Sequence, residues 1–347
     1  MTKAEAWNRD MSDAELEHLA KSHGPRRGLA PWASWESERT GFGWLFRRRA
    51  VFPRFLPLMF ASDHYIYSLT TKRDNEVHHG LAFYATWNAA KYQVLLNAGV
   101  NVLHVRHPWL DLRERRFRNL TGGRGTLIFW PHGHDKLAPQ MDLAKFSVLM
   151  EALPEEYHPI SICVSSYEIQ NGEYKTIRRF GYPLTTIGDL LDQRFPTRFY
   201  RALQTFAYTA GPHSSTHVYL SLEAGVPFLL FGRDCFAYRR RLPDGSLGGI
   251  HDSTLHNFPD ERNRQVEERF LARLERPMHA VPDDLVNHCR QQMGNESTVS
   301  RKQFALEVWK ALWTERNKVI GLYRDSFRRK AKLVRRSGGT DARVGDI

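Results

Sequence analysis

Between residues 126 and 231 the sequence alternates short apolar runs with longer segments in which apolar residues recur at helical spacing. The short runs predict strands at residues 126–130, 160–164, 184–187, 206–209 and 228–231, and the longer segments predict helices near 140–152, 173–180, 196–205 and 216–224. Strands that alternate with helices indicate a mostly parallel sheet covered on both faces. In such a sheet ligands bind beyond the carboxyl ends of the strands, so the loops that follow strands are the places to search for chemistry.

The flanking regions show helical patterns as well. Residues 12–22 predict a short helix with Ser12 as its N-cap. Residues 83–96 predict a helix that ends near Gly99, followed by a strand at residues 100–105. Beyond Gly232 the pattern becomes helical, and we expect these helices to pack back on the N-terminal part of the chain; the candidates are residues 260–276, 281–292 and 300–315.

The chain length sets the number of domains. A chain of 347 residues is long enough for two domains of about 150 residues each. The polar, arginine-rich stretch 111–125 predicts the connection between them. We therefore expect an α/β protein with two Rossmann-type lobes, mostly parallel sheets and a helical C-terminal segment. Its expected parts are a peripheral segment 1–45, an N-terminal lobe 46–120, a C-terminal lobe 121–258, helices 259–323 that pack across the lobes, and a basic tail 324–347.

The composition of the chain indicates the cellular compartment in which the protein is expected. With 41% hydrophobic and 25% charged residues, the chain resembles ordinary folded proteins. Cys163, Cys235 and Cys289 are far apart and form no CxxC pair, which argues against a disulfide framework or a zinc knuckle and favours a reducing compartment. The sequence contains neither an N-terminal signal pattern nor an apolar run of about 18 residues. We expect a cytoplasmic protein, with peripheral attachment to the inner face of the membrane as a further option.

The formal net charge of +12 favours binding partners that carry negative charge. Much of the excess is local, in residues 47–49 and 324–336. Two interpretations stay open: a solvated face with a frayed basic tail, or attraction to an anionic membrane surface, where each cation contributes about 1 kcal/mol. Nucleic-acid binding rests on charge alone, because the sequence contains no recognisable recognition module, and we do not expect it.

The segment 206–231 contains the strongest candidate site. A predicted strand runs into Gly211 and Pro212, and a histidine and three hydroxyl residues then begin a predicted helix: His213, Ser214, Ser215 and Thr216. Free N–H groups at a helix start, aided by the helix dipole and nearby hydroxyls, form a phosphate site that needs no metal. The alternative is that Ser214 or Ser215 only caps the helix. The residues alone favour neither interpretation.

A second candidate loop follows the predicted strand 126–130, and its polar residues are His132, His134, Asp135 and Lys136. A histidine cation there would neutralise the charge that develops on a leaving phosphate. A metal site is the first alternative, but a hydrolase of the HxHxDH kind needs aspartate and histidine at positions 136 and 137, where Lys136 and Leu137 stand. The second alternative is a structural pair of turn histidines. We expect no metal.

Three further residues are candidates for a role in binding or catalysis: Glu168, Asp63 and His64. Glu168 follows the strand 160–164 and is placed to bind a sugar or nucleoside hydroxyl, with an ordinary loop as the alternative. Asp63 and His64 are the candidate catalytic base, which takes a proton from an acceptor hydroxyl, with a structural role as the alternative.

The sequence contains no GxSxG elbow around Ser214, no GxGxxG and no GxxxxGK[ST], which argues against an α/β-hydrolase, a dinucleotide enzyme and a P-loop kinase.

Residues 206–232, together with Trp130, Pro131 and His132 and with residues 57–64, resemble bacterial capsular and surface-polysaccharide biosynthesis proteins related to GT-B glycosyltransferases. The resemblance covers roughly residues 50–235. More distantly, the chain is similar to bacterial sialyltransferases and Kdo transferases, whose His-Pro and Ser-Ser/Thr motifs hold the phosphate and nucleotide of a CMP-sugar. His132 matches the first of these motifs, but Gly133 replaces its proline. A CMP-, UDP- or GDP-linked donor therefore stays open.

The resemblance implies a glycosyltransferase that moves a sugar from a nucleotide-sugar donor to a surface-polysaccharide or lipid-linked acceptor. It implies a donor site in the C-terminal lobe, an acceptor site in the N-terminal lobe and no cofactor or metal. The candidate catalytic residues are Asp63, His64 and His132, and the candidate donor phosphate or nucleotide residues are His132, His134, Glu168, His213, Ser214, Ser215, Thr216 and Glu223. Of these, the resemblance matches His132 to the first motif and Ser214, Ser215 and Thr216 to the second. The alternative is a catalytically inactive scaffold of the same fold in a membrane-associated polysaccharide assembly complex.

Overall fold

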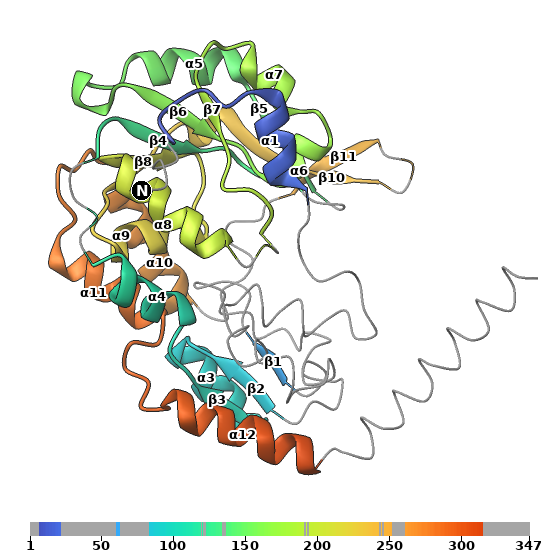
Figure 1. Cartoon of the computed structure of the whole chain (residues 1–347), viewed down its shortest axis with the longest axis vertical. Helices are drawn as coiled ribbons and strands as arrows, with labels where there is room; N and C mark the ends of the chain where they lie inside the picture. The colour runs from blue at the N-terminus through green and yellow to red at the C-terminus, as the bar shows by residue number, and fades with distance from the viewer. Residues whose placement is uncertain are drawn as a thin grey trace, which may run out of the picture.

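A computed structural model describes residues 7–21, 60–62, 83–118, 120, 123–133, 137–190, 192, 194–242, 244, 246–251 and 261–314. These residues form a mixed α/β protein, with a large parallel sheet, a smaller parallel sheet and a short antiparallel sheet (Figure 1). The α/β class and the mostly parallel main sheet agree with the sequence. Asp63, His64, His134, Asp135 and Lys136 lie outside the described residues.

In the described part of the chain, the main sheet has five strands in the order β7-β6-β4-β8-β9. Its strands are β4 (Thr126–Phe129), β6 (Ile160–Cys163), β7 (Leu184–Thr185), β8 (Tyr208–Gly211) and β9 (Phe228–Leu230), and every neighbouring pair is parallel. The chain moves outward from β4 to β6 and β7, then returns to the other side of β4 at β8. The strand order therefore reverses between β4 and β8, which is where open α/β sheets bind ligands.

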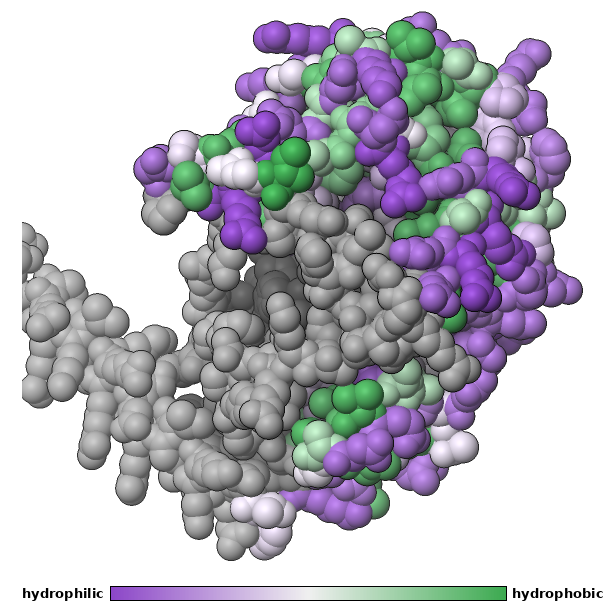
Figure 2. Space-filling model, turned by 180° about the vertical axis from the view of Figure 1, so that it is seen from behind, coloured by the Kyte–Doolittle hydropathy of each residue, from purple (hydrophilic) through white to green (hydrophobic). Residues whose placement is uncertain are grey.

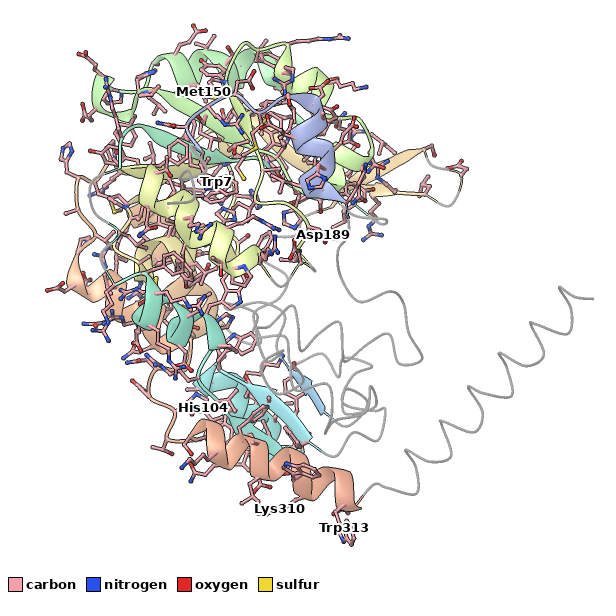
Figure 3. The ribbon with its side chains drawn as sticks, in the orientation of Figure 1. Trp7, His104, Met150, Asp189, Lys310 and Trp313 are labelled. Carbon is pink, nitrogen blue, oxygen red and sulfur yellow. The ribbon has the colours of Figure 1, made fainter. Side chains whose placement is uncertain are left out.

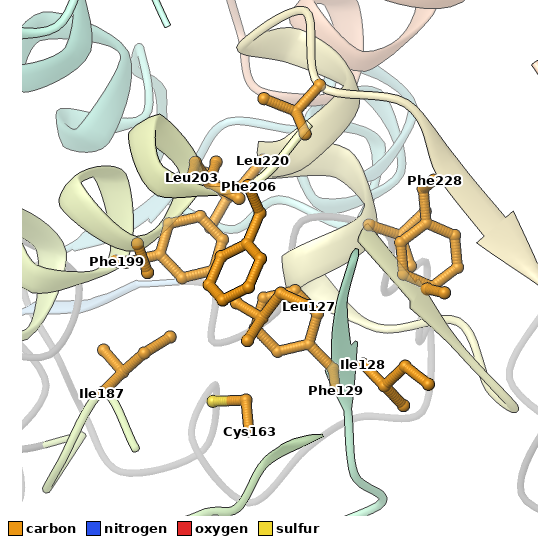
Figure 4. Packing of buried hydrophobic residues seen from close by; sticks show 14 of the residues in the cluster. Leu127, Ile128, Phe129, Cys163, Ile187, Phe199, Leu203, Phe206, Leu220 and Phe228 are labelled. Carbon is orange, nitrogen blue, oxygen red and sulfur yellow. The ribbon is translucent and has the colours of Figure 1, made fainter. Parts of the chain in front are cut away.

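Helices cover both faces of the main sheet. Helix α5 (Leu143–Glu151) lies on one face, and α8 (Phe195–Thr205) and α9 (Thr216–Glu223) lie on the other (Figure 1). Side chains of a strand point alternately to the two faces: the Trp130 ring contacts Phe146 of α5, whereas the Phe129 ring stacks on Phe199 of α8. Leu127 also lies on the α8 side of β4, and Ile128 on the opposite side (Figure 4).

The connection from β6 to β7 is helical too, through α6 (Ser166–Gln170) and α7 (Tyr174–Arg178). Helix α1 (Asp13–Ala20) has the predicted N-cap, because Ser12 and Glu15 form a capping box. Residues 7–21 do not form a detached segment: Trp7 and Leu16 are fully buried, and the Met11 N–H donates to the Leu184 carbonyl oxygen at 2.8 Å. This part of the expected peripheral segment belongs to the core of the large lobe.

The smaller parallel sheet has the order β1-β2-β3, with β1 (Phe60–Ser62), β2 (Phe83–Thr86) and β3 (Val102–His104). The prediction of a helix from residue 83 was wrong over the first turn, because Phe83–Thr86 is a strand and α3 spans Ala89–Asn97. All four residues of β2 are buried, and a short buried run has no periodicity that separates strand from helix. Helix α4 (Pro108–Arg116) covers the first part of the predicted linker 111–125, whose role as a connection between domains stays a prediction.

The prediction of helices directly after Gly232 was also wrong. A short helical turn, η4 (Arg233–Cys235), is followed by strands β10 (Phe236–Arg241) and β11 (Leu247–His251). Together with β5 (Leu137–Met141) they form an antiparallel sheet in the order β11-β10-β5. Strand β5 directly follows the loop after β4, so this sheet lies beside the end of the main sheet at which ligands are expected.

The C-terminal helices are α10 (Glu261–Leu274), α11 (Asp283–Gln292) and α12 (Arg301–Thr314). Helix α11 packs on α9, and α12 packs on the small sheet, where the Phe304 ring meets Phe83 edge to face at 5.9 Å. None of the helices in the described ranges combines the length and the apolar character needed to cross a membrane. Seen from behind, the described surface is largely hydrophilic, with limited apolar patches (Figure 2).

Candidate functional site

The loops after β4 and β8 meet where the strand order reverses. His132 lies in the first loop and His213 in the second, and their ring centroids are 6.2 Å apart. The fold thus brings together two residues that are 81 positions apart in the sequence. His132 is exposed, whereas the His213 side chain is buried, with 7% of its surface accessible.

The second loop ends at the N-terminus of α9. Ser215 is the N-cap residue, but among the described residues its side chain makes no capping hydrogen bond. Its Oγ instead pairs with Nδ1 of His217 at 2.8 Å. Helix capping therefore does not explain Ser215, and its hydroxyl does not cover the first-turn N–H groups. Those groups and the positive end of the helix dipole favour an anion here.

Two histidines stand at this helix start: His213 is buried and His217 is half-buried. The His213 ring meets His217 edge to face at 5.4 Å, and His217 stacks on Phe129 at 4.4 Å. Within the described part of the chain, both ring nitrogens of His213, Nε2 of His217 and Oγ of Ser214 are buried without a hydrogen-bond partner. Buried polar groups in folded proteins are almost always hydrogen-bonded, so a cluster of exceptions indicates a site for a ligand.

Burial also sets the charge of these histidines. Burial, and to a lesser extent the nearby His132, lowers the pKa of His213 to about 3. Burial likewise holds the pKa of His217 well below its usual value. Both rings are therefore neutral near pH 7, and each has one N–H donor and one acceptor nitrogen. The predicted cationic role of His132 is a separate question and stays a prediction.

The loop after β4 is held by its backbone. The Gly133 N–H donates to Glu168 Oε1 at 2.6 Å, and Ser165 Oγ donates to the other carboxylate oxygen of Glu168. On the opposite side, Tyr238 Oη donates to the His132 carbonyl oxygen at 3.2 Å. A Cβ on Gly133 would lie 2.9 Å from both Pro139 and Tyr167, so the loop passes through a space that only glycine fits.

Glu168 has a different role from the one expected. Its side chain is completely buried, and both carboxylate oxygens accept hydrogen bonds from the protein, so the carboxylate does not face a ligand. Burial raises its pKa to about 7. Glu168 is a positioning residue for the His132 loop rather than a group that binds a sugar or nucleoside hydroxyl.

Glu223 is not brought to the site. It ends α9, about 10 Å along the helix from Thr216. Its buried carboxylate pairs with Arg113 of α4 and Arg290 of α11, each at 3.2 Å. Glu223 therefore ties α9 to its neighbouring helices. The structure thus gathers His132, His213, Ser214, Ser215 and Thr216 and leaves Glu223 apart; Asp63, His64 and His134 lie outside the described residues, so their proposed roles stay predictions.

Two aromatic residues of β10 that were not predicted from the sequence line the site. Phe236 and Tyr238 contact each other edge to face at 4.7 Å, and their ring centroids lie 5.7 and 6.3 Å from that of His213. The period-two spacing of Phe236 and Tyr238, just after the last strand of the main sheet, was the signal that could have identified this strand. Their rings form an apolar wall beside the buried histidine.

Among the described residues no three histidine, cysteine, aspartate or glutamate side chains are grouped as a metal ion would need. Comparison with protein-family models gives no match, and comparison with curated proteins gives none. The fold and the geometry of the loops after β4 and β8 therefore carry the functional argument.

Proposed function

We propose that this protein is a glycosyltransferase with two GT-B-like lobes, which takes a sugar from a nucleotide-sugar donor and transfers it to a polysaccharide or lipid-linked acceptor. The observation that carries the proposal is His213: a buried histidine without a hydrogen-bond partner in the described chain, at an uncapped helix start, where the order of a parallel sheet reverses. This combination supports a phosphate group as the ligand.

The donor phosphate would accept hydrogen bonds from the first-turn N–H groups of α9, from Ser214 Oγ and from one ring N–H of His213. Hydrogen bonds to a charged group contribute about 1.5–3 kcal/mol each, so three of them contribute about 4.5–9 kcal/mol against the cost of association. The exposed His132 on the neighbouring loop would reach the same phosphate from the other side. Phe236 and Tyr238 would exclude water beside it.

The same contacts would assist the reaction. In a single displacement, the acceptor oxygen attacks the anomeric carbon while the bond from that carbon to the phosphate oxygen breaks. The leaving nucleotide takes the electron pair, and the fixed donors around its phosphate stabilise the charge that develops. A base must take the acceptor proton, and Asp63 with His64 remains the candidate pair. The small parallel sheet β1-β2-β3 belongs to the lobe proposed to bind the acceptor.

Thermal denaturation of the full chain with CMP, UDP and GDP tests the donor site. A nucleotide present at a hundred times its dissociation constant should stabilise the fold by about 2.7 kcal/mol. His213→Ala and Ser214→Ala should each reduce this shift strongly. His279→Ala is the matched control, because His279 is exposed and its nearest ionic partner is Glu156, away from the loops after β4 and β8. If no nucleotide raises the melting temperature, or if His213→Ala keeps the full shift, the proposal is wrong.

Binding and turnover must be separated. Hydrolysis or transfer from a bound nucleotide-sugar releases free nucleotide, which a coupled assay measures directly. Release that depends on an added acceptor and on His132 supports the transferase. Nucleotide binding without any release, with every acceptor tested, would instead support the inactive scaffold.

A further inference from the structure

Strand β10 continues away from the candidate site with a basic residue in line with its two aromatic rings. Strands β10 and β11 extend beyond the main sheet, and side chains project from both of their sides (Figure 3). Side chains of a strand alternate between its two sides, so Phe236, Tyr238 and Arg240 share one side of β10. Arg239 lies on the other side. The rings of Phe236 and Tyr238 are beside that of His213, so the side of β10 that faces His213 also carries Arg240.

Arg240 also lies beside the loop that carries His132. In the antiparallel pairing of β10 with β5, Arg240 is directly opposite Leu137, the first residue of β5 after that loop. Paired residues of antiparallel strands have Cα atoms about 4.5–5.5 Å apart. The loop passes this pair closely, because a Cβ on Gly133 would lie 3.0 Å from the Leu137 carbonyl oxygen. Tyr238, which donates to the His132 carbonyl oxygen, is about 7 Å from Arg240 along the strand. Arg240 therefore borders the site on its His132 side.

The charge of Arg240 is available to a ligand. Its side chain is exposed and makes neither a hydrogen bond nor an ion pair with any described residue. The next residue, Arg241, differs in this respect, because it pairs with Glu173 at 3.0 Å. An arginine presents its N–H donors in a planar fork that matches two oxygens of one phosphate. The aromatic rings of Phe236 and Tyr238 displace water beside the site, and charges attract each other more strongly where water is displaced.

We infer that Arg240 binds a second phosphate of the ligand whose first phosphate is held at the start of α9. The inference rests on the proposed function and narrows its donor to a nucleoside diphosphate sugar, UDP- or GDP-linked, rather than a CMP-linked one. The two phosphates of a diphosphate share an oxygen. One of them accepts hydrogen bonds from the first turn of α9, Ser214 and His213, and the other accepts them from the guanidinium of Arg240. A nucleoside monophosphate leaves that guanidinium in water.

The same contact would act on the leaving group. When the bond from the anomeric carbon to the oxygen of the terminal phosphate breaks, its electron pair passes to that oxygen, and the acceptor oxygen forms the new bond to carbon. The acceptor proton goes to the base, and the nucleoside diphosphate leaves. A cation beside the diphosphate stabilises the charge that develops on it. Arg240 therefore selects the donor and also favours the departure of its nucleotide.

Calorimetric titration of the full chain tests the inference with nucleotides that share a base: CMP against CDP, and UMP against UDP. Base and ribose are the same within each pair, so the ratio of the two dissociation constants measures the effect of the second phosphate. We expect the native chain to bind each diphosphate about tenfold or more tightly than its monophosphate. Arg240→Gln should weaken the binding of the diphosphates about tenfold and change that of the monophosphates less than about twofold.

Arg239→Gln is the matched control. It removes the same charge one residue away, on the other side of β10, and the Arg239 Nε also lacks a hydrogen-bond partner among the described residues. This variant should keep the native ratio. Arg240→Lys keeps the charge without the planar fork and should give a ratio between those of the native chain and Arg240→Gln. The inference is overturned if the native chain binds monophosphates and diphosphates equally, if Arg240→Gln keeps the native ratio, or if Arg239→Gln lowers the ratio as much as Arg240→Gln does.

Inorganic phosphate and pyrophosphate separate this inference from the proposed function, because they contain neither base nor sugar. Pyrophosphate that binds more tightly than phosphate and depends on Arg240, without turnover of any nucleotide-sugar, would support the second phosphate contact and refute the transferase. Monophosphates that bind through His213, together with an Arg240→Gln variant that binds diphosphates as the native chain does, would refute this inference and leave the donor site in place. Failure of every phosphate compound to bind would refute both.

Discussion

Replacement of His213 by leucine is the sharpest test of the candidate site. The His213 side chain is 7% exposed and lies among the rings of His132, His217, Phe236 and Tyr238. Neither ring nitrogen is hydrogen-bonded by any group in the described chain. Leucine fills a similar volume and has no polar atom. The substitution therefore removes the free-energy cost of burying a polar ring without hydrogen bonds, and it keeps most of the packing contacts of the side chain.

The expected effect follows from two opposing contributions. Burying a polar group without a hydrogen bond costs about 1–3 kcal/mol, and leucine removes this cost. The loss of ring contacts costs about 0.5–1.5 kcal/mol. The net result at pH 7 is a gain of about 1 kcal/mol, which raises the melting temperature of a chain of this size by about 2 °C. A binding residue that destabilises the free protein is a common cost of function.

The gain should depend on pH. Burial lowers the pKa of His213 from 6.5 in the unfolded chain to about 3 in the folded chain. Between these values the unfolded chain binds the proton and the folded chain does not, so stability is lost as the pH falls, by up to about 1.4 kcal/mol per pH unit. His107 and His217 are shifted in the same direction by burial. The native chain should melt lower at pH 5 than at pH 7, and His213→Leu should reduce this difference.

Urea denaturation at pH 7 and pH 5, followed by circular dichroism, measures both effects, and the same samples with nucleotide measure binding. We expect the variant to be more stable than the native chain without nucleotide and unaffected by nucleotide. The reasoning is refuted if the variant loses more than about 1 kcal/mol at pH 7, because His213 would then make a favourable structural contact. A nucleotide shift of native size in the variant would show that the ring nitrogens are not ligands.

Two further substitutions test the packing around the His132 loop and a buried carboxyl group in the core. Gly133→Ala places a Cβ 2.9 Å from Pro139 and Tyr167, so the His132 loop must move. We expect nucleotide affinity to fall at least tenfold, while the free energy of unfolding falls by less than about 2 kcal/mol. Nucleotide affinity equal to that of the native chain would contradict this prediction. Glu267 is buried with Tyr219 Oη donating to it at 2.9 Å, and burial raises its pKa to about 7, so its stabilisation is lost as the pH rises from 4.5 through 7. The free energy of unfolding of Glu267→Gln should therefore exceed that of the native chain at pH 8, by at most about 3 kcal/mol, and equal it at pH 4. A difference that does not change with pH would exclude ionisation as its cause.

The periodicity of apolar residues located the strands and helices of the main sheet to within a few positions. The loops that follow β4 and β8 could also be selected, because a parallel sheet presents its binding edge at the strand ends. The pattern failed where residues were buried on all sides, as at Phe83–Thr86, and where arginines dominate a strand, as at Phe236–Arg241. In both segments local sequence carries too little periodicity to separate strand from helix.

The sequence by itself determined the local features of this protein: the capping box at Ser12, the hydroxyl-rich start of α9 and the basic run at residues 324–336. Each depends on neighbours a few residues away. Only the tertiary structure decided that Glu168 holds the Gly133 backbone and that Glu223 pairs with arginines of other helices. The physical reason is that the role of a carboxylate depends on burial and on partners from distant segments, and these are fixed by how the strands are ordered rather than by the residues beside it in the sequence.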